Sequence, residues 1–223
     1  MTAYKIKRFP APFDSPALAG VTQSCAFILA ANWLVQGMRG MDRKELAFRL
    51  LLEAALAAVL LTALTPIGLG APAAPTCALM LAHSLNFTLN GQVWVCARYC
   101  PWYRRNQAAS ARFLDAACRL LECQAWLDEA ALIGSRGRSG TAWGPRSDID
   151  LRLVVPPGLS GWLRANLLLL RLRSHAFVRV IPLDLYAYDS PASLGRLDQA
   201  EPLRPVLDRC GRLAAAFPHR IAR

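Results

Sequence analysis

Two aspartates one residue apart, Asp148 and Asp150, stand at the start of the apolar run DIDLRLVV. The run predicts a strand, and residues i and i+2 of a strand point to the same face of a sheet, so the two carboxylates converge. Neighbouring carboxylates repel each other unless a cation lies between them. Mg²⁺ prefers such oxygen ligands and completes its shell with phosphate oxygens. The pair therefore indicates a metal site that holds a phosphorylated ligand.

A third carboxylate and an upstream turn extend this site. Asp184 lies in the hydrophobic segment PLDLY, where it can bind a second metal or take the proton of an attacking hydroxyl. Gly134 lets the backbone approach phosphates, and Ser135 adds a hydroxyl and an amide at a turn. Arg136 and Arg138 are placed to neutralise a polyphosphate.

These elements resemble the polymerase-β-type nucleotidyltransferase superfamily. Its pattern of hydrophobic-Gly-Ser, a gap, Asp-x-Asp and a later aspartate matches Ile133–Ser135, twelve intervening residues (136–147), Asp148–Asp150 within SDIDL, and Asp184. The resemblance covers residues 129–188, under a third of the chain. It implies a nucleoside triphosphate substrate and Mg²⁺, with Mn²⁺ as the alternative. It also implies the site residues: catalytic and metal-binding Asp148, Asp150 and Asp184, and phosphate-binding Gly134, Ser135, Arg136, Arg138 and Ser147.

The elements around the motif predict an α+β or α/β fold, a short mixed sheet flanked by helices. The order is helix, strand, strand, helix, strand, and we interpret His175 as structural. The expected elements are a helix within 106–131, strands at ALIGS and DIDLRLVV, a helix over 159–175, a long strand over 176–189, and a short helical tail over 191–223.

The N-terminal half is apolar. The chain is 54% hydrophobic and 18% charged, and no charged residue occurs between Glu53 and Arg98. This stretch is long enough for two membrane helices, divided by PIGLGAPAAP at 66–75. We predict a transmembrane hairpin with helices over about 46–64 and 76–97. The alternative is a buried helix pair in a soluble bundle, but the chain is too short to enclose one.

Charges and polar residues orient this hairpin. Basic residues flank both ends and the turn carries none, which predicts an inner-membrane protein with a cytoplasmic catalytic domain. His83, Asn86, Asn90 and Gln92 must face a partner helix or a polar cavity rather than lipid. For residues 15–38 we favour an interfacial or re-entrant helix over a true span. The predicted units are 1–45, with this helix; 46–97, the hairpin; 98–130, an interfacial segment and amphipathic helix; 131–190, the nucleotidyltransferase core; and 191–223, the tail.

The net charge of +11 raises the question of a nucleic-acid partner. Lys is almost absent while Arg is abundant, and basic residues collect where an anionic membrane face favours them, so we do not expect nucleic acid. The seven cysteines contain no CxxC and predict reduced, apolar side chains rather than a zinc site.

These features together predict a membrane-anchored nucleotidyltransferase. Its acceptor or a partner enzyme would lie at the membrane, as in surface-glycan or lipid-linked assembly. Two alternatives stay open: an antitoxin-like minimal nucleotidyltransferase that modifies a partner protein, and a non-catalytic membrane scaffold with this fold. The polar face of the second helix also leaves open a homo-oligomer.

Overall fold

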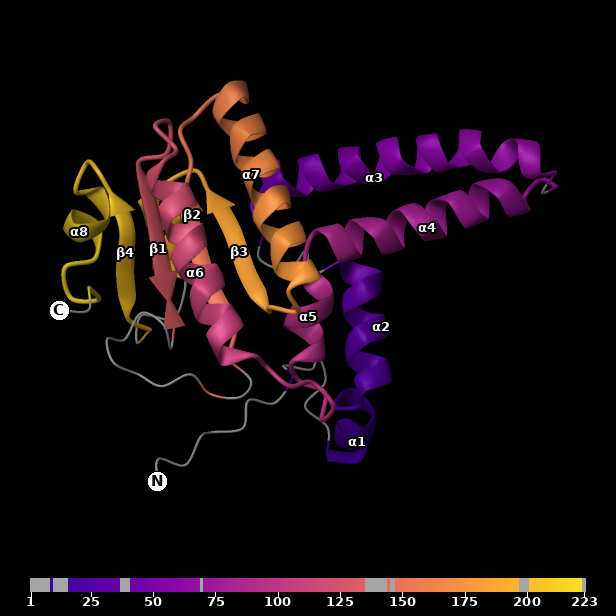
Figure 1. Ribbon diagram of the computed structural model, residues 1–223, viewed down its shortest axis with the longest axis horizontal. Helices are drawn as coiled ribbons and strands as arrows, with labels where there is room; N and C mark the ends of the chain where they lie inside the picture. The colour runs from indigo at the N-terminus through magenta and orange to yellow at the C-terminus, as the bar shows by residue number, and fades with distance from the viewer. Residues whose placement is uncertain are drawn as a thin grey trace.

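Four strands form one mixed sheet at the centre of the α/β body (Figure 1). The structure, a computed structural model, describes residues 9, 16–36, 41–68, 70–134, 144, 147–196 and 201–221. The sheet order is β3-β2-β1-β4. The strands are β1 (Glu129–Ile133), β2 (Ile149–Val154), β3 (Leu183–Tyr188) and β4 (Leu203–Asp208). The predicted mixed α/β architecture is therefore confirmed at this level.

The strand pairing follows from the connections. β1 pairs antiparallel with both β2 and β4, while β2 and β3 are parallel because helix α7 (Leu159–Val178) crosses between them. This register places Asp150 directly beside Asp184 and opposite Ile133.

Helices cover both faces of the sheet unequally. Helix α6 (Gln107–Glu122) and α7 pack over one face, and α6 lies in front of the strands in Figure 1. That core contains Leu114, Leu121, Leu132, Leu151, Leu169 and Leu185, among others. The opposite face has a smaller apolar cluster, covered in part by η4 (Pro191–Arg196) and α8 (Arg212–Ala216). Strand alternation places Asp150 and Arg152 on this second face, away from α6 and α7.

Two predicted elements are wrong in detail. The long strand expected over 176–189 begins only at Leu183, because α7 continues to Val178. Val180 adopts φ +58° and its amide donates to the Phe177 carbonyl, which closes the helix before the strand. In place of a purely helical tail over 191–223, the chain adds β4 to the sheet next to β1.

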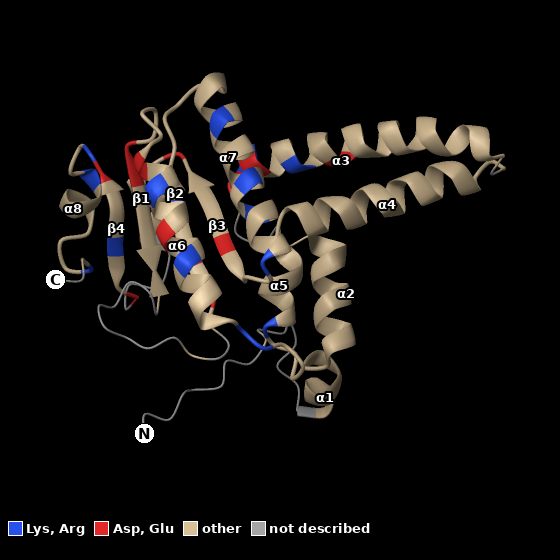
Figure 2. Cartoon of the chain, viewed as in Figure 1, with Lys and Arg blue, Asp and Glu red and all other residues tan. Residues whose placement is uncertain are grey.

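A helical hairpin projects from the α/β body (Figure 1). Helix α3 (Arg43–Leu64) continues into η2 (Thr65–Ile67), and α4 (Ala73–Leu89) returns beside it. Within the described residues, Arg43–Ile67 is the one helix long and apolar enough to cross a membrane, with a mean hydropathy of 2.1. Figure 2 shows charged residues near the base of the hairpin and none toward its tip.

The second helix of the hairpin is shorter than the predicted 76–97. Gly91 adopts φ +71° and breaks the helix, so that residues 92–97 form a separate helix, α5 (Gln92–Ala97). A Cβ at Gly91 would lie 3.4 Å from the Arg173 carbonyl oxygen, so glycine also permits the close approach of α7.

The polar residues of the hairpin face partner elements, as predicted. His83 Nδ1 lies 2.7 Å from Glu53 Oε1 on α3, and Asn86 donates to Glu53 Oε2. Asn90 accepts a hydrogen bond from Arg173 of α7. These contacts join the two hairpin helices and fasten the hairpin to the α/β body.

The N-terminal segment forms short helices at the base of the hairpin. After η1 (Pro16–Leu18) come α1 (Ala19–Thr22) and α2 (Cys25–Val35). Figure 1 shows α2 running across the direction of the hairpin. With 11 residues, α2 is shorter than a membrane crossing requires.

Candidate metal and phosphate site

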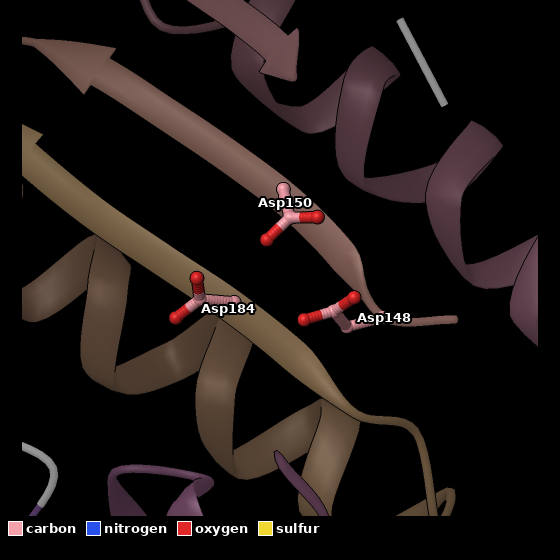
Figure 3. Close-up of side chains that lie close together, drawn as sticks. All are labelled: Asp148, Asp150 and Asp184. Carbon is pink, nitrogen blue, oxygen red and sulfur yellow. The ribbon is translucent and has the colours of Figure 1, made fainter. Parts of the chain in front are cut away.

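Three aspartates converge at one end of the parallel strand pair (Figure 3). One carboxylate oxygen from each of Asp148, Asp150 and Asp184 lies within 4.8 Å of the other two. Asp148 precedes β2 and Asp150 lies within it, so the two-residue repeat of a strand aims both side chains to one side. Asp184 reaches the same point because it is the register partner of Asp150 on β3. The structure thus brings together the three carboxylates predicted from the sequence.

Arg152 lies close to two of these carboxylates. Its Nη2 donates to Asp184 Oδ2 at 2.8 Å and lies 3.8 Å from Asp150 Oδ1. Burial and the neighbouring Asp184 charge raise the pKa of Asp150 to about 7. At Asp184, burial raises the pKa, but the charge and the hydrogen bond of Arg152 outweigh burial and lower it. The pair therefore shares a proton near neutral pH, held mainly by Asp150.

Arg98 supplies a second cation from outside the sheet. It follows α5 and forms an ion pair with Asp148, and both side chains are buried. Sequence reasoning missed both arginines of the site. Arg152 has a detectable signal, since it lies two residues after Asp150 on the same strand and so on the same face. Arg98 has no such signal, because it lies 50 positions before its partner Asp148 in the sequence.

Gly134 lies against Asp150 at the end of β1. Its φ is +73°, and a Cβ built there would lie 3.1 Å from Asp150 Oδ2. The glycine predicted to approach phosphates therefore also makes room for the central carboxylate.

Replacing Gly134 by Ala is expected to cost about 1–2 kcal/mol in backbone strain and to displace Asp150. We expect a lower melting temperature and Mn²⁺ binding at least several-fold weaker, measured by titration. Gly211→Ala is the matched control, because Gly211 has φ +67° with no atom within 4 Å of the added Cβ. An equal loss of Mn²⁺ affinity in both variants would contradict a role for Gly134 at the site.

Of the other residues predicted to bind phosphate, the structure describes Ser147 alone. Ser135, Arg136 and Arg138 lie outside the described residues. Ser147 is described, and its hydroxyl accepts a hydrogen bond from the Gly144 amide while its carbonyl accepts one from Arg105. Ser147 is therefore hydrogen-bonded to Gly144 and Arg105 directly before Asp148.

The shared proton predicts pH-dependent metal binding. A cation needs Asp150 ionised, and its pKa of about 7 means that a proton competes below neutrality. Mn²⁺ affinity is expected to rise up to about tenfold per pH unit below pH 7 and to level off above it. Titration at pH 5.5, 6.5, 7.5 and 8.5 measures this slope. Asp150→Asn should flatten it, and a flat wild-type profile would contradict the coupling.

The carboxylate geometry suits a divalent cation. The oxygen ligands are of the kind Mg²⁺ prefers. The raised pKa of Asp150 follows from its burial and from the neighbouring Asp184 charge, which a bound cation would offset. No family model, no curated protein and no solved structure matches this chain. A functional interpretation therefore depends on the chain order and geometry of the site itself.

Proposed function

We propose that this protein is a membrane-anchored nucleotidyltransferase that uses Mg²⁺, or Mn²⁺, and a nucleoside triphosphate. The observation that carries the proposal is the meeting of Asp148, Asp150 and Asp184 within 4.8 Å, with Gly134 packed against the central carboxylate. The motif order from which the family resemblance was inferred is compatible with this arrangement. A metal bound there would neutralise charge on the phosphates and polarise the reacting phosphorus.

The residues of the chain would divide the remaining work. Asp148 and Asp150 would hold the cation beside the triphosphate, and the backbone at Gly134 would receive the phosphates. An acceptor oxygen forms a bond to the α-phosphorus while the bond to the pyrophosphate oxygen breaks. Asp184 is placed to accept the proton that the acceptor hydroxyl loses. In this step Asp184 must be ionised, the state that Arg152 favours.

The hairpin supports a membrane anchor. Its outer surface exposes large apolar side chains, for instance Val59 at 65% and Ile67 at 67%. A projecting apolar surface of this kind is typical of membrane contact. The proposal makes α3 and α4 a transmembrane pair, although the 17 residues of α4 are at the lower limit for a crossing.

The basic flanks of the hairpin favour a cytoplasmic α/β body at the inner membrane. Helix α2, short and transverse to the hairpin, fits an interfacial position. An anchored site favours an acceptor or partner enzyme at the same membrane face, and surface-glycan or lipid-linked assembly is the class we propose.

Incubation of the purified protein with each labelled triphosphate, Mg²⁺ and a membrane extract tests the proposal. We expect one nucleotide to label one acceptor and to release pyrophosphate, with Asp148→Asn inactive. Labelling that survives in this variant, or no labelling with any nucleotide, would count against it. Fractionation separates the antitoxin-like alternative, which predicts a soluble protein that co-purifies with a partner.

One observation favours a second candidate, the non-catalytic scaffold. Arg98 and Arg152 pair with Asp148 and Asp184 and supply positive charge where a metal would bind. A scaffold of this kind would bind neither metal nor nucleotide in a carboxylate-dependent way. Calorimetric titration of Mg²⁺ and nucleotides onto wild type and Asp148→Ala distinguishes the two functions.

A further inference from the structure

Arg98 reaches the carboxylates from the segment that connects the hairpin to the α/β body. Its guanidinium forms an ion pair with Asp148, and the two side chains are 9% and 4% exposed. On its other side, Nη2 donates to the Tyr99 hydroxyl at 2.9 Å, and the guanidinium carbon lies 4.9 Å from the centre of that ring. Arg98 is therefore held between an aromatic support and the first carboxylate of the site.

The charges of the site define what Arg98 must do when ligands bind. With all three carboxylates ionised, as metal binding requires, Asp148, Asp150 and Asp184 contribute three negative charges, while Arg98 and Arg152 contribute two positive ones. A divalent cation bound to Asp148 would lie within a few ångströms of the Arg98 guanidinium. Repulsion at this distance is strong because the Arg98 and Asp148 side chains are both buried. A triphosphate beside the cation would turn this repulsion into a net attraction, since the guanidinium could donate hydrogen bonds to the phosphate oxygens.

We propose that Arg98 is a positioning residue that holds Asp148 in the ligand-free protein and turns to the phosphates when the metal–nucleotide arrives. The inference rests on the proposed function. It gives Arg98, in the segment between the hairpin and the α/β body, a direct part in ligand binding. It predicts two effects of opposite sign. Arg98 weakens binding of the cation alone and strengthens binding of the cation together with a polyphosphate.

The test compares Arg98→Gln with wild type in two titrations. Mn²⁺ alone, followed by electron paramagnetic resonance, is expected to bind about tenfold more tightly to the variant. Mg²⁺ with inorganic tripolyphosphate, followed by calorimetry, is expected to bind about tenfold more weakly. Tripolyphosphate avoids any dependence on the nucleotide base. Arg104→Gln is the matched control, because this exposed arginine donates to Pro101 and should change neither affinity by more than about twofold.

A second variant keeps the inference falsifiable if Arg98→Gln does not fold. Arg98→Lys retains the charge but not the planar fork, so Mn²⁺ affinity should stay close to wild type while tripolyphosphate binds about threefold more weakly. Arg98 has no positioning role if both affinities of the glutamine variant move in the same direction, or if the lysine variant binds tripolyphosphate normally. Wild-type Mn²⁺ binding that Asp148→Asn abolishes would still support the proposed metal site. Its absence would instead overturn the proposed function.

Discussion

Replacing Asp184 by Asn is expected to reduce nucleotidyl transfer by about 10³-fold, equivalent to about 4 kcal/mol of transition-state stabilisation. The amide cannot accept the proton of the acceptor and offers no charge to a second metal. Asparagine preserves the size of the side chain, and its oxygen can still accept from Arg152, so β3 should keep its register. Initial rates of pyrophosphate release at saturating triphosphate measure the effect.

Asp189→Asn provides the control for this prediction. Asp189 follows the same strand, is about half exposed, and pairs with Lys44 at 2.8 Å rather than with the site. Its substitution should leave the rate within about twofold of wild type, since exposed ion pairs contribute little. Comparable losses in both variants would show that charge near β3, rather than the carboxylate at 184, determines activity.

Replacing Arg173 by Met is expected to lower the free energy of unfolding by about 3–5 kcal/mol. Arg173 is fully buried and donates to Glu45 of α3, to Asn90 and to the Leu185 carbonyl of β3. Methionine fills much of the space but removes these three donated hydrogen bonds, while Glu45 Oε1 retains the one from Arg49. Thermal unfolding of the full chain in detergent micelles should show a melting temperature lower by about 10 °C.

Arg171→Met is the matched control for this effect. It removes the same charge from the same helix two residues earlier, where the side chain is exposed. A shift below about 2 °C is expected for the control. If the melting temperature falls by the same amount in both variants, the buried network does not hold the hairpin to the sheet.

The carboxylate site could be predicted because its geometry follows from local rules. The two-residue repeat of a strand makes Asp148 and Asp150 converge, and a helix between two strands makes those strands parallel neighbours, which brings Asp184 alongside. The same reasoning predicted that His83 and Asn86 turn toward another helix. For the aspartates, the two-residue repeat of the strand determines the arrangement. For His83 and Asn86, the alternative of facing lipid is unfavourable, and this determines the direction of the side chains.

The features that were missed depend on tertiary contacts or on context. β4 lies in the segment predicted as a helical tail. It joins the sheet at β1, and Pro205 sits beside the register shift that an edge strand tolerates. The strand predicted over 176–189 was too long at its start, because α7 continues to Val178 and Val180 turns the chain with a positive φ. The contact between Glu45 and Arg173 crosses 128 residues, and no local pattern indicates it.

The contacts of Glu53 with His83 and Asn86 restrict how the two hairpin helices can slide along each other. A slip of one helical turn, about 5.4 Å, would separate these groups and leave a carboxylate, an imidazole and an amide facing an apolar surrounding. Only one alignment of the pair satisfies all three. The hairpin therefore has a fixed length, and a displacement of its tip moves α3 and α4 together.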